Sequence, residues 1–226
     1  MLLIIFDLDD TLIDTSGSII PYKLYRALQS MIKEGFIVSS FEEAFEILKR
    51  VDSYSDSSLQ GLKEFLEIHD AVQDKFLQVA FKEIYHNQAF EQEILVTKNA
   101  QETLFELSKK HSLAIVSAGI LDVQIEKMKK AGVDTSIFSR IVVCKEGSKR
   151  EHYERLLEDL KYLPREVIVC GDRIKKDLLP AKTLGCTTVH MKWGRGLYQK
   201  RGVQEVDFSI TSLDQLKPIL LQLEKL

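Results

Sequence analysis

The chain has 226 residues, of which 45% are apolar and 29% are charged, and its formal net charge is -3. This composition is ordinary for a globular protein, and the length accommodates one large domain or a domain with an insertion. The charge pattern indicates no basic surface for nucleic acid or a membrane, and no apolar run approaches the ~20 residues that cross a bilayer.

The chain opens with a strand pattern that ends in acids. Residues 2–6 form a continuous apolar run, which is typical of a strand buried on both faces. Asp7 and Asp9 follow it, and side chains two positions apart on a strand point the same way. Two neighbouring carboxylates at the edge of a core are costly, since each opposes the ionisation of the other. Such a pair therefore indicates a cation site or a reacting group.

Residues 16–94 show no convincing strand pattern and predict a helical insertion. Apolar residues recur there at helical spacing in four stretches, and Ser40 is placed to cap the second. We expect an all-helical cap domain over residues 16–94, inserted after the first strand, with residues 1–15 and 95–226 forming the core. The apolar stripes are Leu24, Leu28, Met31 and Ile32; Phe41, Ala44, Phe45 and Leu48; Leu62, Phe65 and Leu66; and Val72, Phe76, Val79 and Ala80.

Short β-type runs alternate with helical patterns in the rest of the chain. Ile125 and Met128 mark one of these helices, with Gly132 placed to end it. An amphipathic stretch over residues 213–223 predicts a final helix. Strands that alternate with helices indicate βαβ units, and hence an α/β fold with a mainly parallel sheet. After the first predicted strand, residues 2–6, the second to fifth predicted strands span residues 113–116, 140–143, 167–170 and 187–190.

The cysteines indicate a reducing compartment. Cys144, Cys170 and Cys186 are odd in number, form no C-x-x-C pair and border apolar segments. We interpret them as reduced, mostly buried side chains. The N-terminus also lacks the basic segment of a signal peptide. We therefore expect a cytoplasmic protein, with neither nucleic acid nor a membrane among its partners.

Ligand sites in open parallel sheets lie at the carboxyl ends of the strands. The second predicted strand ends in Ser117, Ala118 and Gly119, and the fourth ends just before Asp172. The Ser117 hydroxyl and the N–H groups of Ala118 and Gly119 suit an anion at a helix start, although a serine there also commonly just caps a helix. Asp177 suits the N-cap of the helix that follows, a role that does not exclude a place behind a metal ion.

Two lysines are candidates for contacting an anion at this edge of the sheet. Ser148 and Glu151 match a capping box, which places Lys149 in the first turn of a helix. A cation there is disfavoured by about 0.3–1 kcal/mol, so its presence indicates a nearby anion. Lys145, at the end of the third predicted strand, is the alternative.

In order and spacing, these residues resemble the motifs of the haloacid dehalogenase (HAD) superfamily, in its large phosphatase branch. The chain departs from the family pattern at Arg150, where proline is frequent, and at Ala118, where asparagine is frequent. The matching segments are residues 7–12 (Asp-Leu-Asp-Asp-Thr-Leu) for the first motif, residues 115–117 for the second, Lys149 for the third and residues 169–177 for the fourth.

The resemblance implies a Rossmann-like three-layer core, a helical cap of the first type, and Mg²⁺-dependent hydrolysis of a phosphate monoester through an aspartyl-phosphate. Asp7 would be the nucleophile, and Asp9 would be the general acid and base. Mg²⁺ would be held by the carboxylates of Asp7 and Asp172 and by the Asp9 carbonyl, with Asp177 nearby. The groups binding the phosphoryl group would be Ser117 and Lys149, joined by the Ala118 N–H.

Four functions stay open on the sequence alone. The favoured one is a magnesium-dependent phosphatase acting on a small phosphorylated metabolite. A phosphomutase uses the same two acids, whereas a dehalogenase does not need a proton-donating Asp9. The non-catalytic alternative is a metal-binding or protein-binding domain on the same scaffold. The substrate and the choice between monomer and homodimer also stay open.

Overall fold

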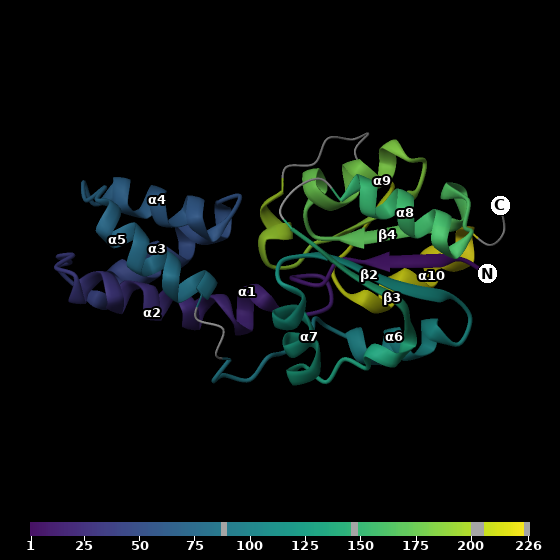
Figure 1. The fold of residues 1–226 in the computed structure, drawn as a ribbon, viewed down its shortest axis with the longest axis horizontal. Coiled ribbons are helices and arrows are strands. Elements are labelled where there is room, and N and C mark those ends of the chain that lie inside the picture. The colour runs from purple at the N-terminus through teal and green to yellow at the C-terminus, as the bar shows by residue number, and fades with distance from the viewer. Residues whose placement is uncertain (87–89, 146–148, 200–205, 224–226) are drawn as a thin grey trace. The chain divides into compact units, whose positions relative to one another are not determined.

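The computed structural model of the protein describes residues 1–86, 90–145, 149–199 and 206–223. The chain divides into two compact units, one formed by Met1–Asp14 with Ile94–Leu226 and the other by Thr15–Glu93. We call the first the core unit and the second the helical unit. Figure 1 shows the elements of both units, labelled in chain order.

Among the described residues, the core unit holds a sheet of six strands in the order β3-β2-β1-β4-β5-β6. Every neighbouring pair is parallel. The strands are β1 (Leu3–Phe6), β2 (Ser112–Ala118), β3 (Phe138–Cys144), β4 (Val167–Gly171), β5 (Thr187–Met191) and β6 (Phe208–Ile210). The chain runs outward from β1 in both directions, so a topological switch point, where ligands bind in such sheets, lies at β1.

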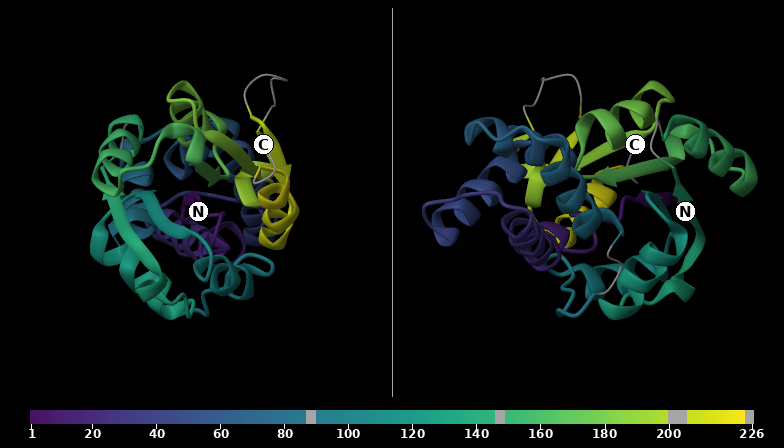
Figure 2. Two further views of the ribbon diagram at one scale, coloured as in Figure 1. Left: turned by 90° about the vertical axis from the view of Figure 1, so that its right-hand side faces the viewer. Right: turned by 60° about the vertical axis from the view of Figure 1, so that its left-hand side comes forward.

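Helices cover both faces of this sheet (Figures 1 and 2). α8 and α9 lie on one face, and α6 and α7 lie on the other. Leu3 and Ile5 of β1 join the hydrophobic cluster under α8 and α9, and all four residues of β1 are buried, as a strand covered on both faces requires. The helices are α6 (Ala100–Ser108), α7 (Leu121–Lys130), α8 (Arg150–Leu160), α9 (Leu179–Thr183) and α10 (Leu216–Leu223). The predicted three-layer α/β fold is confirmed.

Two local predictions in the core unit need correction. α8 begins at Arg150 with Lys149 at its cap position, so Lys149 lies just before the first turn rather than within it. Ser148, the predicted cap, lies outside the described residues. The edge strand β6 is missing from the sequence prediction, because three residues give too short a pattern to distinguish a strand from a loop.

The helical unit contains no strand among its described residues. Its helices are α1 (Thr15–Ser18), α2 (Ile20–Lys33), α3 (Phe41–Tyr54), α4 (Ser58–Ile68) and α5 (Asp74–Phe81), followed by a π-helical turn, Lys82–His86. The Ser40 hydroxyl caps α3 by accepting the N–H of Glu43 at 3.2 Å. The fourth predicted stripe starts too early, since Val72 is exposed and precedes α5. The role of this unit as a cap stays a prediction.

Within the described ranges, every helix is too short or too polar to serve as a transmembrane span. Cys144, Cys170 and Cys186 are buried and carry free thiols. Their burial agrees with the interpretation of these cysteines as small core side chains.

Candidate active site

Backbone hydrogen bonds hold the acids that follow β1. The N–H of Asp7 donates to the Cys170 carbonyl at 2.9 Å, which extends the β1–β4 pairing by one residue. The chain then turns tightly, because the Leu8 carbonyl accepts the N–H of Leu12 at 2.9 Å and Asp10 adopts a left-handed conformation with φ 56°. Asp7 is buried at the end of the strand, and Asp9 is half-buried. Both acids therefore lie at the switch point of the sheet.

The structure distinguishes between the two candidate lysines. The ammonium nitrogen of Lys149 lies 2.6 Å from Asp7 Oδ1 and 2.7 Å from Asp177 Oδ1. The residue is only 3% exposed. Lys145, by contrast, is exposed at the end of β3. Lys149 is thus the lysine that reaches the predicted nucleophile, although the two are 142 residues apart in sequence.

Three buried carboxylates form a cluster, and Lys149 contacts two of them. One carboxylate oxygen from each of Asp7, Asp172 and Asp177 lies within 4.8 Å of the other two. Asp177 lies in a π-helical turn, Ile174–Leu178, and its Oδ2 accepts the N–H of Arg173 at 2.9 Å. A Cβ at Gly171 would lie 2.7 Å from the Asp177 Cβ, so glycine is needed for this close return of the chain.

The predicted N-cap role of Asp177 is wrong. The residue at the N-cap of α9 is Leu178, which makes no side-chain capping bond. The Asp177 carboxylate points instead to Lys149 and to the cluster, because the π-helical turn places it one position before the cap. Pro180 lies in the first turn of α9, where a missing N–H is tolerated.

Burial dominates the electrostatics of the cluster. It raises the pKa of Asp7 to about 7, with Lys149 opposing and Asp177 and Asp9 adding to the rise. Burial, with Asp177 and Asp7 adding, likewise raises the pKa of Asp172 well above its usual value. For Lys149, burial alone would lower the pKa, but Asp177 and Asp7 outweigh it and raise the pKa well above its usual value. The lysine therefore stays charged.

This donor set fits a hard divalent cation. The cluster holds three carboxylates, and one ammonium group contacts two of them, so full ionisation leaves an excess of negative charge in a buried place. Mg²⁺ prefers oxygen ligands and needs only a few carboxylates, because it keeps several water ligands. A cation there would offset the cost of ionising buried, neighbouring carboxyl groups, which is the cost that raises their pKa values.

The C-terminal end of β2 and the residue after it differ in one respect from the sequence prediction. Ser117 is buried, and its Oγ accepts a hydrogen bond from the amide nitrogen of Gln124 at 2.9 Å. The N–H of Gly119 donates to the Cys144 carbonyl at 2.9 Å, which continues the pairing of β2 with β3. That N–H is therefore already used, and the predicted anion cradle at Gly119 is wrong. Ala118 is exposed at the end of β2.

Sequence reasoning missed two side chains on α7. The ammonium of Lys127 lies 2.7 Å from Asp9 Oδ1, and the amide nitrogen of Gln124 lies 3.0 Å from Asp9 Oδ2. The sequence prediction gave the inner face of this helix to Ile125 and Met128, but the structure exposes Ile125 and buries Gln124. The available signal was the spacing of Gln124, Lys127 and Met128, which share one helix face.

The segment after β5 also borders the site. Trp193 donates its indole N–H to Asp14 Oδ1 at 2.8 Å. A Cβ at Gly194 would collide with the Asp10 carboxylate, and one at Gly196 would lie 3.1 Å from the Asp172 Cβ. The segment after β5 thus forms a 3-10 turn, Gly194–Tyr198, whose glycines lie close against Asp10 and Asp172.

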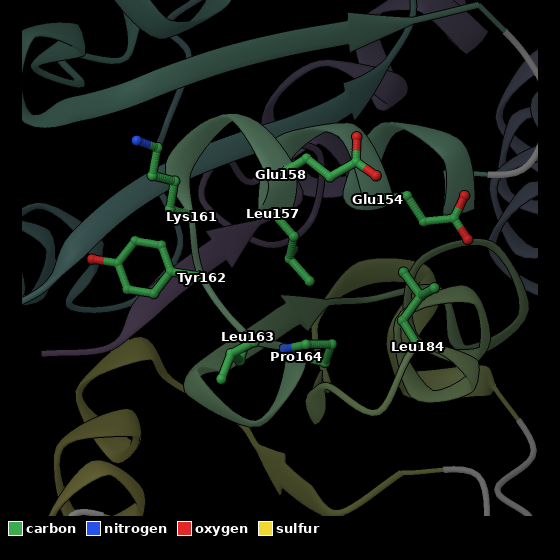
Figure 3. Close-up of a pocket in the computed structure, with 8 residues that line it drawn as sticks. All are labelled: Glu154, Leu157, Glu158, Lys161, Tyr162, Leu163, Pro164 and Leu184. Carbon is green, nitrogen blue, oxygen red and sulfur yellow. The ribbon is translucent and has the colours of Figure 1, made fainter.

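Figure 3 shows a pocket elsewhere in the core unit, with a volume of about 390 Å³. It lies beside the C-terminal end of α8, the loop that follows and the end of α9. Its lining residues are Glu154, Leu157, Glu158, Lys161, Tyr162, Leu163, Pro164 and Leu184. None of the clustered acids belongs to it, so the pocket is separate from the candidate active site.

Comparisons with known proteins identify the family of this chain. The family model for haloacid dehalogenase-like hydrolases matches residues 1–185. The chain therefore belongs to the haloacid dehalogenase-like hydrolases, and the resemblance seen in its motifs is confirmed.

Two relatives match almost the whole chain. The glyceraldehyde 3-phosphate phosphatase of Pyrococcus furiosus is 30% identical over 224 residues, which cover 96% of this chain and 92% of that protein. The glyceraldehyde 3-phosphate phosphatase of Methanocaldococcus jannaschii is 30% identical over 231 residues, covering 98% of each. The HAD-hydrolase YfnB of Bacillus subtilis, solved bound to magnesium, has the same fold, with a TM-score of 0.65 at 17% identity over 97% of this chain and 98% of that one.

Proposed function

We propose that this protein is a Mg²⁺-dependent phosphatase that hydrolyses a small phosphate monoester through an aspartyl-phosphate on Asp7. The observation that carries the proposal is the buried Asp7 carboxylate beside Lys149, 2.6 Å away, within a carboxylate cluster at the switch point of the sheet. The two relatives named as phosphatases support the reaction class, and they make glyceraldehyde 3-phosphate the first substrate to test.

The acids of the cluster would hold the metal. Asp7 and Asp172 would supply carboxylate oxygens and Asp9 its backbone carbonyl, while Asp177 would stay close by, bound to Lys149. When bound, Mg²⁺ offsets the repulsion between the anionic nucleophile and the phosphate dianion and polarises the phosphoryl oxygens. Lys149 and the Ser117 hydroxyl would contact phosphoryl oxygens, with the Ala118 N–H beside them.

The reaction proceeds in two displacements. A carboxylate oxygen of Asp7 attacks phosphorus, and the bond from phosphorus to the substrate oxygen breaks as the new bond forms. Asp9 donates its proton to the departing alcohol oxygen. Asp9 then accepts a proton from a water molecule that attacks the phosphorus, so that inorganic phosphate leaves and Asp7 is regenerated. We assign substrate choice and the exclusion of bulk water to the helical unit acting as a cap.

The protein is proposed to work in the cytoplasm. Cys144, Cys170 and Cys186 are buried free thiols, which is usual for proteins of a reducing compartment. The substrate is proposed to be a small phosphorylated metabolite, and the protein is proposed to act as a monomer or a homodimer.

Phosphate release tests the proposal. The purified protein is incubated with Mg²⁺ and a panel of phosphate monoesters that includes glyceraldehyde 3-phosphate and hexose phosphates. We expect inorganic phosphate from at least one monoester, and none when EDTA replaces Mg²⁺ or when the variant is Asp7→Asn. Asp159→Asn, at an exposed position on α8, is the matched control and retains activity. No phosphate from any monoester would refute the proposal, and isomerised hexose phosphate without phosphate release would indicate a phosphomutase.

A further inference from the structure

Both carboxylate oxygens of Asp9 are contacted from α7. Lys127 Nζ lies 2.7 Å from Oδ1, and Gln124 Nε2 lies 3.0 Å from Oδ2. Residues three positions apart on a helix are neighbours on one face. Two side chains of one helix thus restrain the rotation of the Asp9 carboxylate.

Gln124 also connects Asp9 to Ser117. Its amide nitrogen lies 2.9 Å from Ser117 Oγ and 2.9 Å from the Ala118 carbonyl. That nitrogen carries two hydrogens, so at most two of its three acceptors are well served at one time. When Ser117 Oγ accepts one of them, the hydroxyl hydrogen of Ser117 points elsewhere and can be donated to a phosphoryl oxygen.

The burial of the Gln124 amide is not explained by the stability of the fold. Gln124 is 2% exposed, and its Oε1 has no hydrogen-bond partner among the described residues. The neighbouring Ile125 is 38% exposed. A buried amide oxygen without a partner is costly, and an apolar side chain on the inner face of the helix would avoid that cost. The polar inner face therefore indicates a function.

Gly119 makes room for this amide. Its φ is +141°, and a Cβ there would lie 3.3 Å from Gln124 Nε2. A larger residue would be strained by its backbone conformation and would crowd the amide. The turn after β2 and the inner face of α7 therefore fit together.

We propose that Gln124 and Lys127 are positioning residues for the Asp9 carboxylate, and that Gln124 also orients the Ser117 hydroxyl. The inference rests on the proposed phosphatase function. Asp9 must present an oxygen within hydrogen-bond reach of the departing alcohol oxygen, and later of the attacking water. Each carboxylate oxygen can accept through two lone pairs, so one contact from α7 does not by itself exhaust either oxygen.

The test compares two substrates that differ in their need for a proton. An alkyl monoester, such as glyceraldehyde 3-phosphate, leaves as an alcohol and needs the proton of Asp9. The 4-nitrophenolate ion leaves from 4-nitrophenyl phosphate without one. We measure kcat/KM, which includes the step that breaks the bond to the leaving group, for Lys127→Met, Gln124→Met and the unmodified protein. Lys129→Met, at an exposed position on α7, is the control.

We expect Lys127→Met to lower kcat/KM for the alkyl monoester by about tenfold or more, and that for 4-nitrophenyl phosphate by less than about threefold. Gln124→Met should lower kcat/KM for both substrates, because Gln124 also orients Ser117. The loss should be larger for the alkyl monoester, because that substrate also needs Asp9. Lys127→Arg should restore most of the ratio between kcat/KM for the alkyl monoester and kcat/KM for 4-nitrophenyl phosphate. Lys129→Met should leave this ratio unchanged. Thermal unfolding checks that each variant is folded. If Lys127→Met does not fold, the comparison of the two substrates with Gln124→Met tests the proposal.

Equal losses on both substrates, or no loss on either, would overturn the positioning role. The proposed function has a separate outcome, because it fails if the unmodified protein releases phosphate from no monoester of the panel, whatever the α7 variants do. The two failures are therefore distinguishable in one set of assays.

Discussion

Replacing Asp7 with asparagine is expected to change how the stability of the metal-free protein depends on pH. The Asp7 carboxyl is buried beside two other carboxyls, and burial raises its pKa from 3.8 to about 7 even with Lys149 opposing. The folded chain therefore keeps a proton that the unfolded chain releases. As a result, the free energy of unfolding falls as the pH rises between these two pKa values.

The size of the effect follows from the shift. Each pKa unit corresponds to about 1.4 kcal/mol, so the rise from 3.8 to about 7 amounts to about 4 kcal/mol in total. About 3 kcal/mol of this loss falls between pH 5 and pH 8. The asparagine amide does not titrate in this range, so the variant lacks this loss. The stability of Asp7→Asn relative to the unmodified protein should rise by about 3 kcal/mol from pH 5 to pH 8.

Urea unfolding in EDTA, followed by circular dichroism, measures this difference at several pH values. Asp159→Asn is the control, because its exposed position should give a difference that does not vary with pH. Added Mg²⁺ at pH 8 should stabilise the unmodified protein more than Asp7→Asn. A difference between Asp7→Asn and the unmodified protein that stays constant with pH would refute the account of burial at Asp7.

Three further changes probe the cluster. Lys149→Met should lower kcat/KM by about 100-fold or more, measured by phosphate release, because the phosphoryl group loses a charged partner; retained activity would contradict its role. Asp172→Asn should weaken Mg²⁺ binding by about tenfold or more in calorimetry, and unchanged binding would exclude Asp172 as a ligand. Gly171→Ala should lower the free energy of unfolding by about 1–3 kcal/mol in urea, because its Cβ would meet the Asp177 Cβ at 2.7 Å; no loss would contradict the close fit.

Much of the fold could be predicted because its signals are local. Residues 2–6 and 167–170 are apolar runs typical of a strand covered on both faces, and their alternation with helical patterns indicates a parallel sheet. β6 could not be predicted from its three residues, since a strand at the edge of the sheet depends on its neighbour, β5. The start of α8 also needed the structure, because the helix begins at Arg150, one residue later than the capping-box pattern predicts.

The candidate site was predictable where its residues follow strands. Asp7, Asp9 and Asp172 stand at strand ends, which parallel topology brings to one edge of the sheet. The choice of Lys149 over Lys145 needed the side-chain contacts. Gln124 could not be predicted, because an apolar pattern assigns Ile125 to the inner face of α7, whereas hydrogen bonding to Asp9 and Ser117 accounts for the polar residue there.

The most direct test of the central claim is mass spectrometry of the protein quenched with acid during turnover with Mg²⁺ and its substrate. The account predicts one added phosphoryl group on the peptide that contains Asp7, formed as fast as the substrate is consumed and absent from Asp7→Asn. Rapid turnover without any phosphoryl group on Asp7, or continued turnover by Asp7→Asn, would contradict it.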